Sequence, residues 1–151
     1  MLATPRELYL FGENEQDYGT NQQQSNTQAV IRGCANAHGV CTCYARGQGY
    51  RDATLEANCA RIRTDLRDAV CLVLRGTFDM LVIPGNGLGT GVAGLQVHAP
   101  KTHRFLLSEL ERAKRLLRAT RLSVFLRRLM SDMWPLSGAS QSGPDTQSMT
   151  D

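Results

Sequence analysis

The segment from residue 78 to residue 95 constrains the fold of this chain most, because an apolar run passes directly into a glycine-rich loop. Residues 78–83 have the length and composition of a buried β-strand. Pro84 and Gly85 end this run, and glycine then recurs at nearly every second position. Glycine reaches φ > 0 easily and lets the backbone approach a ligand without a Cβ in the way. The segment therefore predicts a ligand site in which successive amides face a phosphate or another anion; the alternative is a flexible connection with many turns.

Residues 53–75 predict the most regular helix of the chain. Apolar residues recur there at spacings of three and four, which places them on one face: Leu55, Cys59, Ile62, Leu66, Ala69 and Val73. We expect Asp52 or Thr54 to cap its first turn and Gly76 to end it. A strand before such a helix and a strand after it are typical of an α/β fold, so we expect a single α/β domain.

Shorter elements precede this helix. Residues 8–11 predict a buried strand that ends at Gly12, and residues 40–44 have strand-like composition. Residues 27–32 predict a short helix. Residues 13–26 are polar and predict a long loop, which in a small domain is usually functional or disordered.

Charge is concentrated in one part of the chain. Residues 101–128 carry nine Lys or Arg against two Glu, a net charge of +7, although the whole chain carries only +3. Pro100 suits the first turn of a helix, which we expect to continue to about Met130. Such an arm can pack on the mildly acidic body, contact a partner protein or a second copy, or bind nucleic acid through phosphates. We favour packing or a protein partner over nucleic acid and expect no membrane binding.

The composition predicts three parts: an α/β domain over residues 1–113, a basic helical extension over residues 114–134, and a disordered tail over residues 135–151. No run of about eighteen apolar residues predicts a membrane span, and the N-terminus lacks the pattern of a secretory signal. The cysteines are odd in number and lack CxxC spacing, which indicates reduced thiols. We therefore expect a cytoplasmic protein.

Three cysteines and a histidine gather within ten residues: Cys34, His38, Cys41 and Cys43. They are zinc ligands by type, but their spacing matches no common zinc motif. Whether they bind a metal stays open, and we expect free thiols, with no metal and no cofactor. The role of the Gln-rich residues 20–28 is likewise open.

Four segments occur in an order that resembles a known family. They are Phe11-Gly12-Glu13-Asn14-Glu15-Gln16, Ile31-Arg32-Gly33-x-x-Asn36-Ala37-x-Gly39, Ile83-Pro84-x-x-Gly87-Leu88-Gly89-Thr90-Gly91-x-Ala93-x-Leu95, and Ala99-Pro100-Lys101-Thr102. The pattern spans roughly residues 8–110 and resembles a family of small, largely uncharacterised phage and bacterial proteins with FGDN, IRGEPNA and GIGTGLA motifs. That family in turn is similar to the macro domain, an α/β module that binds ADP-ribose.

The resemblance implies a three-layer α/β domain with a mixed sheet and a macro-like topology. It places Asn14 near a ribose or the scissile bond. Glu13 stands where the family has Asp, and a carboxylate beside a bound sugar can orient a hydroxyl or activate water. The resemblance further implies that backbone amides wrap a diphosphate, and the residues that it assigns to binding are Gly12, Gly85, Gly87, Leu88, Gly89, Thr90 and Gly91.

The chain departs from the family pattern at two loops. The paired glycines of a GGQA segment are absent from the longer stretch 19–29, and Cys41 and Cys43 replace a proline and a lysine. Side chains at these places narrow a pocket, so we expect binding through the second glycine loop. Gly89→Val is expected to abolish binding while leaving the fold near intact, because valine adds bulk and restricts φ.

We therefore expect the chain to bind a nucleotide-type ligand, ADP-ribose or a related diphosphate. Whether it also hydrolyses an ADP-ribosyl linkage, with Asn14 and Glu13 as the catalytic pair, is open. One alternative is a non-catalytic module, of the kind that a phage uses, that sequesters a nucleotide signal in the host cytosol. Another is an interaction protein that works through its basic C-terminal helix, residues 101–130.

Overall fold

The structure is a computed structural model that describes residues 4–23 and 27–133, with side chains described up to residue 123. Its contacts divide the chain after Thr120, and from Arg121 onward the described residues are the last turns of one helix. The tail predicted to be disordered, residues 135–151, lies outside the described residues. The domain boundary expected at residue 113 stays a prediction.

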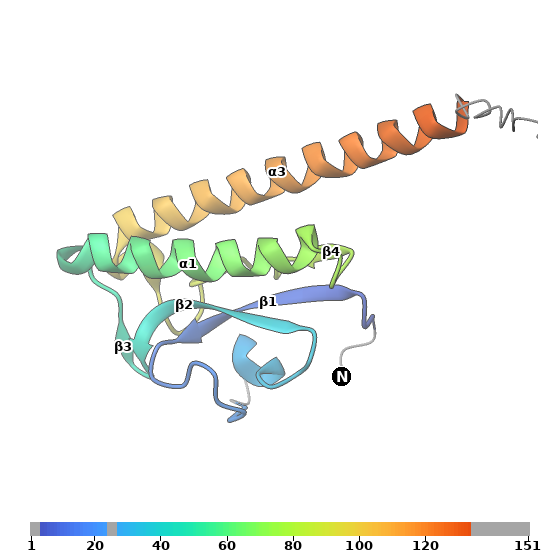
Figure 1. Ribbon diagram of the computed structural model, residues 1–151. Helices are drawn as coiled ribbons and strands as arrows, with labels where there is room; N and C mark the ends of the chain where they lie inside the picture. Colours follow the sequence, from blue (N-terminus) through green and yellow to red (C-terminus); the bar gives the residue numbers. More distant parts are fainter. Residues whose placement is uncertain (1–3, 24–26, 134–151) are drawn as a thin grey trace, which may run out of the picture. The chain divides into compact units, whose positions relative to one another are not determined.

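A curled, mixed sheet forms the middle of the α/β domain (Figure 1). Its strands, in spatial order β3-β2-β1-β4, are β1 (Glu7–Asn14), β2 (Ala37–Ala45), β3 (Gln48–Gly49) and β4 (Met80–Val82). β1 pairs in parallel with β2 on one side and with β4 on the other, and β2 pairs antiparallel with β3. The expected α/β domain with a mixed sheet is confirmed.

Helical elements lie on both sides of this sheet (Figure 1). They are the 3₁₀ turns η1 (Gln28–Ile31) and η2 (Asp52–Thr54) and the helices α1 (Leu55–Leu74), α2 (Leu95–His98) and α3 (Pro100–Met133). α1 packs on β2 and β4, whereas η1 packs on β1. The first turns of α3 join the same core as α1, because Leu106 and Leu110 cluster with Ile62 and Leu66.

Strand β1 sends its side chains into two environments. Leu8 and Leu10 are buried in the main core beneath α1, where each apolar side chain contributes about 1.5–3 kcal/mol. Phe11 and Glu13 are also buried, but they lie outside that cluster and flank Gly39, where an added Cβ would lie 2.9 Å from the Glu13 Cβ. The alternation of a strand therefore places a carboxylate on the side of the sheet opposite to the main core.

Two predicted strands differ from the observed ones. β1 does not end at Gly12, because Gly12 pairs with Val40 in the ladder with β2 and the strand continues to Asn14. The strand predicted as buried over residues 78–83 is shorter and lies at the edge of the sheet, so Met80 is exposed. An apolar run alone does not distinguish an edge strand from a buried one.

The predicted helices are confirmed with small shifts. α1 begins at Leu55 after η2, and α3 continues through Thr120 without a break. A 3₁₀ turn, followed by Gly33 at φ +80, replaces the short helix expected over residues 27–32. The sequence does not predict β3 or α2, because two to four residues are too few to show periodicity.

Asp52 caps a different helix from the one predicted. Its Oδ2 accepts the Lys101 N–H at 3.0 Å and its Oδ1 accepts the Thr102 N–H at 3.1 Å, so it caps α3. Thr54, at the start of α1, makes no capping hydrogen bond. Burial raises the pKa of Asp52, but the hydrogen bonds from Lys101 and Thr102 outweigh it and hold that pKa below its usual range.

Asp52→Ala removes this cap, and we expect the melting temperature at pH 7 to fall by a few degrees. Because the folded-state pKa is lowered, the charge stabilises the fold above the unfolded-state pKa of about 3.9, and this contribution is lost as the pH falls through the folded-state value. Thermal unfolding followed by circular dichroism should therefore show the wild type and the variant converging below pH 4. The exposed Asp68 supplies a control, Asp68→Ala, and an equal loss there would contradict the assignment.

Candidate functional site

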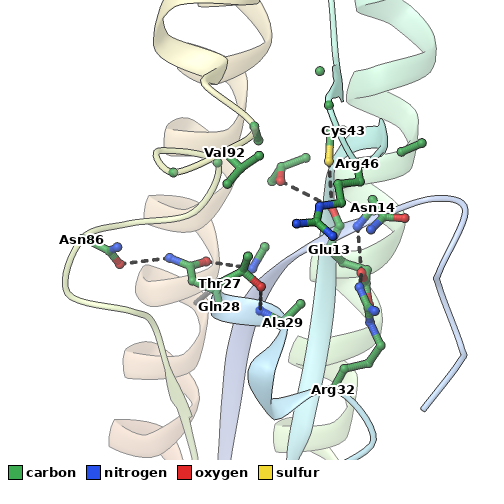
Figure 2. A pocket seen from close by; sticks show the side chains of 18 residues that line it. Glu13, Asn14, Thr27, Gln28, Ala29, Arg32, Cys43, Arg46, Asn86 and Val92 are labelled. Atoms are coloured by element: carbon green, nitrogen blue, oxygen red, sulfur yellow. Dashed lines mark hydrogen bonds and ion pairs between the residues drawn. The ribbon is translucent and has the colours of Figure 1, made fainter. Parts of the chain in front are cut away.

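A cavity of about 470 Å³ opens where β1 and β2 end (Figure 2). Its lining comes from the end of β1, the turn η1, the β2–β3 hairpin and the loop between β4 and α2. In the sheet, β2 lies next to one edge of β1, and β4, which comes later in the chain, lies next to the other edge. Ligands of open α/β sheets bind at such a switch point, outside the carboxyl ends of the strands. The cavity therefore lies where this architecture favours a binding site.

The structure brings part of the predicted binding set to this cavity. The predicted residues that line it are Gly12, Glu13, Asn14, Gly89 and Gly91. The predicted residues outside its lining are Gly85, Gly87, Leu88 and Thr90. Leu88 is buried in the core, and the Thr90 hydroxyl donates to the Asn86 carbonyl at 2.8 Å. These two side chains hold the shape of the glycine loop.

Gly89 serves the core as well as the cavity. It adopts φ +71, and an added Cβ would lie 2.5 Å from the Leu95 Cδ1 and 2.9 Å from its Cγ. Leu95 is fully buried, so it cannot move aside without a cavity or a clash elsewhere. The expectation that Gly89→Val leaves the fold near intact is therefore wrong, because the substitution strains the backbone and overpacks the core.

Successive backbone N–H groups of the glycine loop have no acceptor among the described residues. From Gly89 to Ala93, none of these groups donates to any residue within the part of the chain that the structure describes. Most of this stretch lines the cavity, including Gly91 and Val92. A run of unengaged N–H groups in a turn-like loop forms a concavity that suits an anion.

Arg46 adds a positive charge to the same cavity. It lies in the turn between β2 and β3, and Figure 2 shows its side chain extending into the cavity near Glu13 and Asn14. Its side chain makes no hydrogen bond or ion pair to any described residue. Its charge therefore remains available to an anionic ligand.

Glu13 forms a buried ion pair with Arg32. The Glu13 Oε2 accepts the Arg32 Nε–H at 2.7 Å, and Oε1 accepts both an Arg32 Nη2–H and the Asn14 backbone N–H. Only 2–3% of either side chain is exposed, and the hydrogen bond and charge of Glu13 raise the pKa of Arg32. Both oxygens of the carboxylate are therefore occupied, which leaves Glu13 poorly placed to take a proton from water or a hydroxyl.

Asn14 uses its amide to shape the loop that follows β1. Its Oδ1 accepts the Asp17 backbone N–H at 2.8 Å, and its Nδ2 donates to the Asp17 carboxylate at 3.0 Å. One Nδ2 hydrogen remains for a molecule in the cavity. Asn14 therefore ends β1 and offers a ligand fewer free hydrogen-bonding groups than an unengaged amide would.

Gln28, from the Gln-rich segment without an assigned role, joins three parts of the cavity wall. Its Oε1 accepts the Gly12 N–H at 2.8 Å, while its Nε2 donates to Asn86 Oδ1 at 2.9 Å and to the Gly87 carbonyl at 2.7 Å (Figure 2). Both amide hydrogens are used, so the side chain is fixed. This one residue links the middle of β1 to the start of the glycine loop.

The cysteines and the histidine that are clustered in the sequence have different surroundings in the fold. Cys41 is buried in the core, and the His38 Nε2 lies 2.9 Å from the Asp65 carbonyl oxygen. Cys43 lines the cavity, where burial and then the nearby Glu13 charge raise the pKa of its thiol to about 11. It is therefore protonated, and a weak nucleophile, at neutral pH. Among the described residues, no group of three or more Cys, His, Asp or Glu is arranged to hold a metal ion.

Three residues that determine the character of the cavity are not predicted as site residues from the sequence: Gln28, Arg32 and Arg46. Arg32 stands within a motif of the resembled family, next to Gly33, and that was the available signal. No local pattern marks Arg46, because its importance comes from a hairpin with a two-residue second strand. Gln28 is one of several glutamines in its segment, and only its contacts in the folded protein distinguish it from the others.

The fold is an α/β domain with a cavity at the switch point of its sheet. Residues 1–109 match the family of unknown function DUF7831, and the chain belongs to this family. No curated protein and no solved structure matches the chain. Within residues 4–23 and 27–133, no helix is both long and apolar enough to cross a membrane.

We expect Arg32→Met to destabilise the domain by about 3–5 kcal/mol, because it leaves the Glu13 charge buried without its partner. Urea unfolding at pH 7 measures the change. Arg6→Met removes an arginine from an exposed pair with Asp79 and should have little effect. Similar losses in the two variants would contradict the assigned importance of the buried pair. The double variant Glu13→Gln/Arg32→Met should recover part of the stability, since no buried charge remains.

Proposed function

We propose that the cavity at the end of β1 binds a nucleotide-type ligand, ADP-ribose or a related diphosphate, through its phosphate groups. The observation that carries the proposal is the run of N–H groups from Gly89 to Ala93 beside Arg46, none of which is engaged by a described residue. Phosphate oxygens accept hydrogen bonds from both kinds of donor, and bonds to a charged group are the stronger ones.

The size and place of the cavity support the same proposal. Small-molecule sites commonly have volumes of about 300–1,000 Å³, and this cavity has about 470 Å³. A three-layer, macro-like arrangement is part of the proposal. Its support is the central β1 with parallel neighbours on both sides, and the helical elements on both sides of the sheet (Figure 1).

Binding without turnover is the version of this function that we favour. Hydrolysis of an ADP-ribosyl linkage requires a group that activates water. Glu13 has both oxygens engaged by Arg32 and the Asn14 N–H, and the Cys43 thiol is protonated at neutral pH. The chain therefore resembles a module that holds or sequesters its ligand more than it resembles a hydrolase.

Isothermal titration with ADP-ribose tests the proposal, and Arg46→Gln should weaken binding at least about tenfold, because hydrogen bonds to charged groups contribute about 1.5–3 kcal/mol. Arg51→Gln is the matched control, since Arg51 is exposed, carries the same charge and lies outside the cavity lining. Chromatography of the same mixture should detect no product. No binding at millimolar ADP-ribose would overturn the proposal and favour an interaction protein that uses residues 101–130.

A pair of glycine variants tests the loop without disturbing the core. An added Cβ at Gly91 or at Gly85 meets no atom within 4 Å, and neither residue has a positive φ. Only Gly91 lines the cavity, so Gly91→Val should weaken ADP-ribose binding at least tenfold and Gly85→Val should not. Melting temperatures close to wild type in both variants show that the fold is retained. Equal binding by the two variants would place the ligand elsewhere.

A further inference from the structure

We infer that the cavity recognises a phosphorylated sugar and leaves the nucleobase of a nucleotide-type ligand outside. The inference rests on the proposed function and narrows it to one class of ligand, a ribose phosphate or a similar polyhydroxylated phosphate ester. It is carried by the hydrogen-bonding character of the lining and by the placement of the aromatic side chains.

Among the side chains of the lining and the N–H groups of residues 89–93, the hydrogen-bonding groups that no described residue engages are mainly donors. They comprise the N–H groups of residues 89–93, the guanidinium of Arg46, and the amide nitrogens of Asn14 and Asn86. The Asn86 Oδ1 already accepts one hydrogen bond from Gln28, whereas its NH₂ donates to no described residue, and Asn14 retains one NH₂ hydrogen. Phosphate and hydroxyl oxygens accept from such donors, whereas a purine also requires acceptors opposite its own N–H groups.

The carboxylates near the cavity do not supply the missing acceptors. Glu13 accepts two hydrogen bonds from Arg32 and one from the Asn14 N–H, and only 2% of its side chain is exposed. Asp17 accepts from Asn14 and from Arg32, and its carboxylate is not part of the lining. The lining therefore offers a ligand positive charge and N–H groups, a combination suited to an oxygen-rich molecule.

None of the aromatic side chains in the described ranges lines the cavity. The two nearest in sequence to the hairpin, Tyr44 and Tyr50, pack edge to face with ring centroids 4.8 Å apart. Tyr50 is fully buried, and its hydroxyl donates to Glu15 at 2.5 Å. Tyr18 lines a separate cavity of about 250 Å³ and stacks with Arg61. A base would therefore find no ring on which to stack.

Titrations with three compounds test this inference: ADP-ribose, ribose 5-phosphate, and adenosine. Ribose 5-phosphate should bind within about tenfold of ADP-ribose and displace it, whereas adenosine should neither bind nor compete. Arg46→Gln should weaken both phosphate compounds by the same factor, and Arg51→Gln should leave both unchanged. These results together would support the inference.

The other outcomes separate this inference from the proposed function. If ADP-ribose binds but ribose 5-phosphate binds more than a hundredfold more weakly, or adenosine competes, the inference is wrong and the proposed function stands. If ribose 5-phosphate binds and ADP-ribose does not, the sugar-phosphate class is supported and the nucleotide proposal fails. If neither phosphate compound binds at millimolar concentration, both are overturned.

Discussion

The buried ion pair of Glu13 and Arg32 is the interaction on which the candidate site depends. It ties the end of β1 to the residue after η1, and Arg32 also reaches Asp17 and the Gln22 carbonyl in the following loop. A desolvated carboxylate needs such bidentate contact to be tolerated. Because the pair neutralises its own charges, the charge left to the cavity is the positive charge of Arg46. The pairing of Glu13 with Arg32, which the fold requires, thus leaves the cavity with a net positive charge.

The glycine loop combines accessible amides with fixed ends. Leu88 and Leu95 are buried on either side of Gly89, and Gln28 holds Asn86 and Gly87. Binding of the proposed ligand would therefore order few new torsions, and a preorganised loop loses less affinity to ordering than a mobile one. The residues that shape the loop and the groups that are free for a ligand are largely different, which explains why part of the predicted binding set lies outside the cavity.

Local patterns predicted those features that depend on near neighbours in the sequence. The periodicity of residues 53–75 predicted α1, and the apolar residues 8–11 predicted β1, although that strand continues to Asn14. The partners of these residues were not predictable, because Arg32 lies nineteen residues from Glu13 and its pairing exists only in the fold. Asp52 has the right side chain to cap the helix that follows it, yet the tertiary structure directs it to α3. The position of Arg46 depends on the hairpin with β3, and a strand of two residues is too short to be recognised from the sequence.

The cap that Asp52 provides also bears on the order in which the chain is made. Asp52 precedes Lys101 by 49 residues. At roughly 5–20 residues per second, a ribosome takes about 2–10 s to synthesise that interval, which far exceeds the microseconds in which helices form. The residues of η2 and α1 are therefore synthesised before the first turn of α3 exists. When the first turn of α3 is synthesised, the residue that caps it, Asp52, is already part of the chain. The capping group is therefore available as soon as α3 begins to form.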